Sequence, residues 1–153
     1  MVYELERLMG EARRLAAEYR RATGRTLPIS AEIAISDVIR LLSLEPAPSD
    51  APYDALRRSG DRMEKLQVKG RVVFDSKRGG HRLGQLRLGE DWHATLLVLM
   101  DEDYEPYRIY EATHDALNKA LADKPAGKRG SISVARFRAI GTKVWERPEA
   151  PAA

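Results

Sequence analysis

Three side chains that could bind a metal ion and a phosphate lie close together in the sequence: Asp54, Gln67 and Lys69. If residues 53–57 and 64–74 form strands, the two-residue period of a strand puts Gln67 and Lys69 on the same face of the second one. A glycine turn between the segments can fold the second strand back against the first, beside Asp54. A carboxylate, an amide oxygen and an ammonium group would then converge. Sites of this kind hold Mg²⁺ with oxygen ligands and place a lysine beside the attacked phosphate.

A run of basic residues follows this motif. Between Lys69 and Arg87 the sequence has six Lys or Arg residues and a single acid, Asp75. A local basic stripe attracts a polyanion even though the formal net charge of the chain is only +3. The alternative is a solvated surface of mixed charge. Under the first interpretation the following residues contact phosphates: Arg71, Lys77, Arg78, Arg82 and Arg87.

Glu32 is a further candidate. It falls in the first turn of a helix that starts near Ser30, where a carboxylate interacts favourably with the helix dipole. From the same position it could also supply a carboxylate to a site beyond the helix N-terminus, and both interpretations stay open. The histidines at 81, 93 and 114 lack metal-ligand spacing, so we expect His81, His93 and His114 to be surface or packing residues.

The N-terminal half of the chain must position these side chains. Apolar residues spaced three and four apart predict an amphipathic helix over residues 3–22 and a second, well-buried helix from Ser30. Its serine hydroxyl is a good N-cap. Three prolines make residues 45–52 an extended linker. The segments predicted as strands are 53–57, 64–74, 94–100 and 107–111.

The C-terminal half adds two more helices. One is predicted at 113–123, and the last begins at Ser131 or Ser133 and ends at Trp145. The unbroken apolar run at 94–100 predicts a central strand covered on both faces. The sum is an α/β (α+β) fold: a small mixed sheet of four or five strands flanked by two N-terminal and two C-terminal helices.

Composition limits the class of protein. A chain of 153 residues fits one domain, which we place at residues 1–146, with a flexible tail at 147–153. Because there is no cysteine, disulfides, Cys-ligated zinc and a thiol nucleophile are excluded. No apolar run approaches the ~20 residues of a membrane helix. The N-terminus is charged and amphipathic rather than a secretory signal, so we expect a cytoplasmic protein that does not enter the membrane.

The order of these elements resembles the core of the PD-(D/E)xK, or restriction-endonuclease-like, superfamily. The resemblance implies that Asp54 and Gln67 bind Mg²⁺ and that Lys69 is catalytic, orienting the attacking water or stabilising the charge of the phosphorane. It makes Glu32 a third ligand or a group that orients the base. Two positions differ from the superfamily pattern: Gln67 stands where an acid is usual, and Tyr53 stands where the name implies proline.

Two further comparisons follow from the sequence. The superfamily has a helix between its third and fourth core strands, whereas residues 101–106 predict a tight turn. The chain also resembles an uncharacterised bacterial family, which brings no established activity. The segments that carry this second resemblance are 11–19, 67–71, 97–103 and 133–137.

Three functions remain open at this stage. The first is a nuclease-like domain, a Mg²⁺-dependent endonuclease with a degenerate Asp…Gln-x-Lys motif that hydrolyses or binds DNA phosphodiesters. The second is a non-catalytic nucleic-acid-binding module on the same scaffold. The third is a protein-interaction protein of the antitoxin or immunity type, whose N-terminal helix docks on a partner or on a second copy to form a homodimer.

Overall fold

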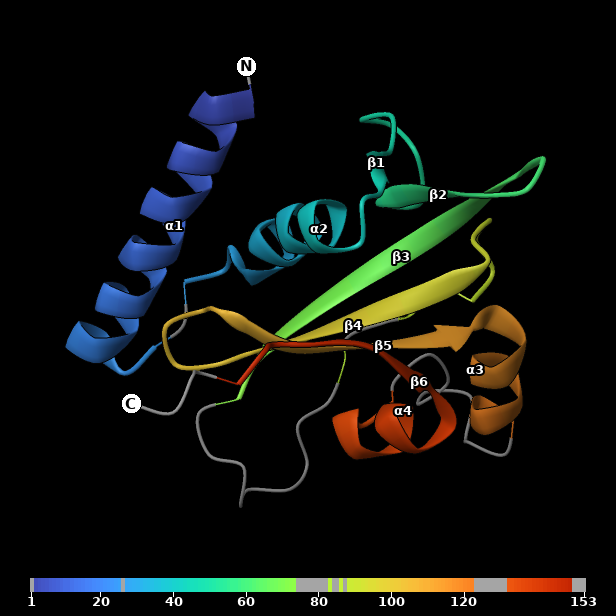
Figure 1. Ribbon diagram of the computed structural model, residues 1–153. Coiled ribbons are helices and arrows are strands. Elements are labelled where there is room, and N and C mark those ends of the chain that lie inside the picture. Colours follow the sequence, from blue (N-terminus) through green and yellow to red (C-terminus); the bar gives the residue numbers. More distant parts are fainter. Residues whose placement is uncertain are drawn as a thin grey trace.

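The computed structural model describes residues 2–25, 27–73, 83, 86, 88–122 and 132–149. Within these residues the chain forms four helices and one six-stranded sheet, with helices on both faces of the sheet (Figure 1). The helices are α1 (Val2–Thr23), α2 (Ser30–Leu41), α3 (His114–Leu121) and α4 (Val134–Ile140). The strands are β1 (Glu45–Pro46), β2 (Ala55–Ser59), β3 (Arg62–Val72), β4 (Ala94–Met100), β5 (Pro106–Thr113) and β6 (Thr142–Glu146).

The strands lie in the sheet in chain order, from β1 to β6. β3 and β4 are parallel, and the other neighbouring strands are antiparallel, so the sheet is mixed as the sequence predicts. Gly60, with a φ of 63°, makes the predicted turn between β2 and β3. A tight turn also joins β4 to β5, where the backbone N–H of Asp101 donates to the carbonyl of Glu105 at 2.9 Å.

Two hydrophobic clusters lie on opposite faces of the sheet. On one face Leu66 and Val68 of β3 pack with Leu96 and Val98 of β4 against α1 and α2. On the other face Leu97 and Leu99 of β4 and Tyr110 of β5 pack against α3 and α4. Every residue of β4 is buried, which confirms the prediction of a central strand covered on both faces.

Gly70 lets α2 approach the sheet closely. A Cβ at this position would lie 2.7 Å from Cβ of Ala34 and 3.0 Å from the carbonyl oxygen of Ser30. The first turns of α2 therefore rest directly on β3. Because neighbouring residues in a strand point to opposite faces, Lys69 points away from α2, toward the face that α3 and α4 cover.

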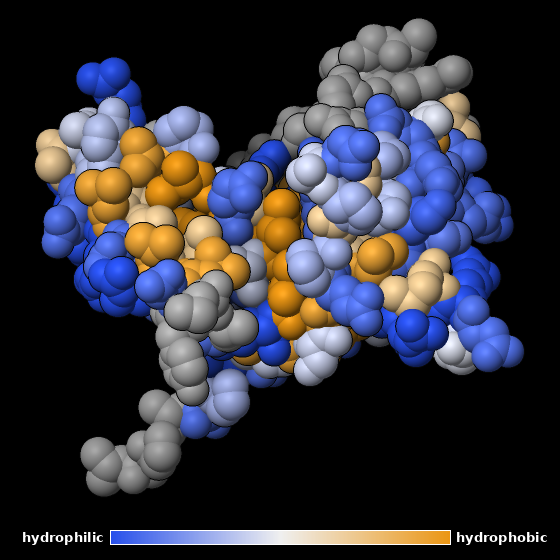
Figure 2. All heavy atoms as spheres, turned by 90° about the horizontal axis from the view of Figure 1, so that it is seen from above, coloured by the Kyte–Doolittle hydropathy of each residue, from blue (hydrophilic) through white to orange (hydrophobic). Residues whose placement is uncertain are grey.

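α1 contacts the rest of the molecule along a narrow stripe. Ala16 and Ala17 are buried, whereas Leu5, Leu8 and Leu15 are 53%, 51% and 57% exposed. The N-terminal end of α1 stands apart from the other elements in Figure 1, and Figure 2 shows an apolar patch on the side of the molecule where α1 lies. The helix is thus amphipathic, as predicted, but much of its apolar stripe faces solvent.

The sheet has six strands rather than the predicted four or five. The short β1 forms within the proline-containing segment that we expected to be only a linker. β6 occupies residues that we assigned to the last helix, since α4 ends at Ile140 and Trp145 belongs to a strand. The free edge of β5 supplies the pairing partner for this segment, and a local helical pattern cannot reveal such an edge.

The helix ends agree only in part with the sequence. Ser133 caps α4, because its hydroxyl oxygen accepts the backbone N–H of Arg136 at 3.1 Å. Ser30 does not cap α2 as predicted: the capping position is Ile29, and Ser30 is already inside the helix. Of the predicted tail, residues 150–153 lie outside the described residues, and Arg147 donates its backbone N–H to the carbonyl of Tyr107 at 3.0 Å.

Among the residues that the structure describes, no helix combines the length and the apolar character needed to cross a bilayer.

Candidate metal centre

Asp54 immediately precedes β2, where the chain meets β3. Its backbone N–H donates to the carbonyl of Leu66 at 2.8 Å. Its carboxylate oxygen Oδ2 accepts the backbone N–H of Val68, also at 2.8 Å. The carboxylate of Asp54 therefore accepts a backbone N–H of β3 that a backbone carbonyl would accept in regular strand pairing. Because Val68 stands between Gln67 and Lys69, the structure brings Asp54 to the segment that the motif predicts.

Gln67 is almost completely buried, with 4% of its surface exposed. Its amide oxygen Oε1 accepts the hydroxyl of Thr95 at 3.0 Å, and Thr95 is fully buried. The two residues stand opposite each other in the parallel pair β3–β4. A buried amide is tolerated because it is hydrogen-bonded. A carbonyl oxygen has two lone pairs, so the bond to Thr95 leaves the second one for a cation.

Lys69 and Arg71 follow Gln67 on the same face of β3, and both are half-buried. Nη1 of Arg71 donates to the carbonyl of Gly70 at 2.6 Å. Burial lowers the pKa of Arg71, because removal from water disfavours the charged form. The face that carries Gln67 thus also carries two basic side chains that are partly withdrawn from water.

Glu32 does not join this face. It is exposed on α2, and α2 packs against the opposite face through Ala34 and Gly70. Its predicted role as a third ligand or orienting group stays a prediction. The other predicted phosphate contacts also remain predictions, because they fall outside the described residues: Lys77, Arg78, Arg82 and Arg87.

The chemistry of Asp54 and Gln67 suits a hard cation, since carboxylate and amide oxygens are ligands for Mg²⁺ and Ca²⁺. Within the described ranges, no three His, Cys, Asp or Glu residues come together as a metal-holding group. Two protein oxygens would leave most coordination positions to water and phosphate. Mg²⁺ accepts this arrangement, because it dehydrates reluctantly and is often held by one or two carboxylates and substrate phosphates.

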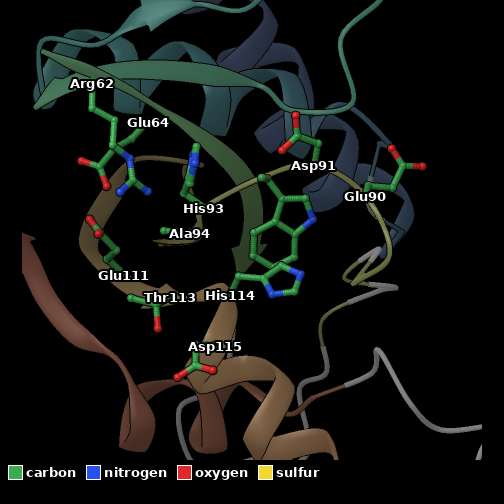
Figure 3. A pocket seen from close by; sticks show the side chains of 11 residues that line it. Arg62, Glu64, Glu90, Asp91, His93, Ala94, Glu111, Thr113, His114 and Asp115 are labelled. Atoms are coloured by element: carbon green, nitrogen blue, oxygen red, sulfur yellow. The ribbon is translucent and has the colours of Figure 1, made fainter.

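The sequence did not reveal a pocket of about 480 Å³ between the start of β3, the end of β5 and the start of α3 (Figure 3). Both histidines that line this pocket are hydrogen-bonded to the backbone or lie within hydrogen-bonding distance of it. Nδ1 of His93 accepts the backbone N–H of Lys65 at 2.8 Å, and Nε2 of His114 lies 2.7 Å from the carbonyl oxygen of Leu88. These contacts agree with the interpretation of His93 and His114 as packing residues.

No family model and no curated protein matches the chain. Among solved structures, a bacterial homing endonuclease, I-Ssp6803I, is similar with a TM-score of 0.44 and 18% sequence identity, over 82% of this chain and 82% of that chain. At this TM-score the similarity carries no argument about the fold or the function of this chain.

Proposed function

We propose that this chain is a nuclease-like domain that uses Asp54, Gln67 and Lys69 with Mg²⁺ to act on DNA phosphodiesters. The observation that supports the proposal best is the hydrogen bond from the backbone N–H of Val68 to the carboxylate of Asp54. It holds a carboxylate against the backbone of the residue that separates Gln67 from Lys69 in the sequence. The resemblance of the motif to the PD-(D/E)xK superfamily points in the same direction.

Each residue has a distinct role under this proposal. Asp54 and Gln67 would hold the ion through their oxygens. When bound, the ion polarises a phosphoryl oxygen and lowers the pKa of a coordinated water. The ammonium group of Lys69 would stabilise the negative charge that develops on the attacked phosphate. Arg71, on the same face, would hold a neighbouring phosphate and so fix the position of the strand.

The test is DNA cleavage by the purified protein with Mg²⁺ or Mn²⁺, on plasmid, linear and single-stranded substrates. We expect Asp54→Asn and Lys69→Ala each to lower the cleavage rate by about 100-fold or more, since each removes charge stabilisation in the transition state. Lys119→Ala is the matched control, because the side chain of this lysine on α3 is 78% exposed. Cleavage at the wild-type rate by both folded site variants would refute the assignment.

A non-catalytic nucleic-acid-binding module is a second candidate. The neutral, buried Gln67 favours it, because an amide holds a divalent ion less strongly than a carboxylate does. This function requires DNA binding that weakens steeply with salt but no cleavage. Arg78→Ala and Arg82→Ala should loosen binding at low salt. An affinity that is equal at low and high salt would exclude this candidate.

A protein-interaction role is a third candidate, favoured by the exposed leucines of α1. A second copy of the chain could cover Leu5, Leu8 and Leu15 in a homodimer. Light scattering should then give twice the monomer mass for the wild-type chain and the monomer mass for Leu8→Lys. A monomer for both proteins at all concentrations would contradict the homodimer.

A further inference from the structure

Gln67 and Thr95 form a buried polar pair at the β3–β4 boundary, beside apolar residues of β4. Thr95 is fully buried, Gln67 is 4% exposed, and their side-chain oxygens are 3.0 Å apart. The next residues on the same face of β4 are Leu97 and Leu99, which belong to the hydrophobic cluster under α3 and α4. A buried polar pair contributes little net stability, because the hydrogen bond only offsets the loss of water. Two apolar side chains at these positions would pack at least as well.

The chemistry of the pair fixes the direction of the hydrogen bond. The oxygen Oε1 of Gln67 is only an acceptor, so the hydroxyl of Thr95 must donate. This bond holds one end of a long side chain that otherwise costs up to about 2 kcal/mol of rotamer entropy when it is ordered. Thr95 itself stands on β4, the most buried strand of the sheet, so its hydroxyl has a fixed position.

We propose that Thr95 is a positioning residue that orients the amide oxygen of Gln67 as a ligand for a divalent cation. The inference rests on the proposed function, because it assumes that Asp54 and Gln67 hold the ion. Thr95 does not touch the ion or the DNA. Its hydroxyl occupies one lone pair of Oε1 and leaves the other in a defined direction. Residues that orient a metal ligand in this way typically change metal affinity 10- to 100-fold when they are replaced.

The experiment measures the affinity of the full chain for Mn²⁺, alone and without DNA, by calorimetry. We expect Thr95→Val, which keeps the shape and removes the hydroxyl, to weaken Mn²⁺ binding by about 10- to 100-fold. Thr95→Ser keeps the hydroxyl and should bind within about threefold of the wild type. The melting temperature of each metal-free variant shows whether a change in affinity is merely a loss of folded protein.

The outcomes separate this inference from the proposed function. Failure of the wild-type chain to bind Mn²⁺ contradicts the proposed function, and the inference falls with it. Wild-type binding that Asp54→Asn removes, together with equal affinity in Thr95→Val, overturns only the role of Thr95. If Thr95→Val does not fold, Thr95→Ala decides by the same criterion. In a Gln67→Ala background, replacing Thr95 should change Mn²⁺ affinity no further, since the group that it orients is gone.

Discussion

Under the proposed function, Gln67 is a neutral ligand at a position where a carboxylate would bind a divalent ion more strongly. Its environment explains why an amide suits the folded chain. The side chain is buried, and the carboxylate of Asp54 is held against the backbone of the next residue. Burial and a neighbouring negative charge both disfavour a second ionised carboxylate. Under the proposed function, the amide has a lower affinity for the ion than a carboxylate would have, but it avoids a second buried negative charge.

Replacing Gln67 by glutamate tests this balance. We expect Gln67→Glu to lower the free energy of unfolding at neutral pH without metal by about 1–3 kcal/mol, because burial and the nearby Asp54 carboxylate both disfavour the new negative charge. Because burial raises the pKa of the introduced carboxyl, the loss should shrink as the pH is lowered and the group takes up a proton. Added Mn²⁺ should stabilise this variant more than the wild type. Urea denaturation with and without Mn²⁺ measures both effects.

Gln67→Met is the matched control, because it keeps the length of the side chain and carries no charge. Its stability should respond less to Mn²⁺ than that of the wild type. An equal response to Mn²⁺ in Gln67→Glu and Gln67→Met would show that position 67 does not meet the ion.

At the level of elements, the contact between α2 and β3 depends on Gly70. We expect Gly70→Ala to lower the free energy of unfolding by about 1–3 kcal/mol, because the new Cβ would lie 2.7 Å from Cβ of Ala34 and 3.1 Å from Cε of Met100. Chemical denaturation measures the loss. Gly10→Ala is the control, since Gly10 lies inside α1 with nothing within 4 Å, and this change should stabilise the chain by up to about 1 kcal/mol.

A second substitution, at Ala34, shows whether the stability lost in Gly70→Ala arises from the contact between residues 70 and 34. Ala34→Gly removes the Cβ that an alanine at position 70 would meet. The double variant should therefore lose less free energy of unfolding than the sum of the losses in the two single variants. Strict additivity of the two changes would place the strain elsewhere.

A buried ion pair joins α1 to α2. Nη2 of Arg13 lies 2.7 Å from Oδ1 of Asp37, and Nη2 of Arg40 lies 3.2 Å from the same oxygen. Burial raises the pKa of the Asp37 carboxyl above its ordinary value of 3.8, although Arg13 and Arg40 oppose this effect. The folded chain therefore holds a proton on this carboxyl up to a higher pH than the unfolded chain does.

This shift predicts a stability that depends on pH. The contribution of Asp37 is fully present below 3.8, where both states are protonated, and is lost as the pH rises through the folded-state pKa. Relative to Asp37→Asn, which does not titrate, the wild type should lose free energy of unfolding across that window. Urea denaturation at a series of pH values measures the difference. Asp50→Asn, at an exposed position, should show no such trend, and an identical trend in both variants would contradict the prediction.

At the scale of the whole molecule, Arg57 connects strands that are not neighbours. From β2, its Nη1 and Nη2 donate to the two carboxylate oxygens of Glu111 on β5 at 2.7 and 2.9 Å, and its Nε donates to Glu64 on β3 at 3.1 Å. These hydrogen bonds, above all those that Arg57 donates to Glu111, raise the pKa of Arg57. Both carboxylates line the pocket in Figure 3. Arg57, Glu64 and Glu111, which we call the Arg57 clamp, therefore hold that end of the sheet together.

Removing the guanidinium group of the Arg57 clamp should destabilise the folded chain. We expect Arg57→Met to lower the free energy of unfolding by about 2–4 kcal/mol, because Glu64 and Glu111 would be left close together without a cation. Thermal and urea unfolding measure the loss. Arg58→Met changes the next, exposed residue of β2 and should stay within about 0.5 kcal/mol of the wild type. Equal losses in the two variants would mean that the clamp contributes nothing specific.

Local patterns predict much of this molecule. Residues spaced three and four apart predict α1 and α2, the apolar run predicts the central strand β4, and glycine at position 60 predicts the turn that folds β3 onto β2. The approach of Asp54 to Gln67 and Lys69 follows from that hairpin alone. These features depend on residues near one another in the chain, so short-range periodicity and turn geometry are enough to find them.

Other features depend on residues that are far apart in the chain. The pairing of Gln67 with Thr95 requires the parallel register of β3 and β4, and Trp145 forms a strand because β5 offers a free edge. Glu32 lies on the layer opposite Lys69 because α2 packs through Gly70. Side-chain types and local spacing are written in the sequence, whereas the register of distant strands and the face that a helix covers arise only when the whole chain packs.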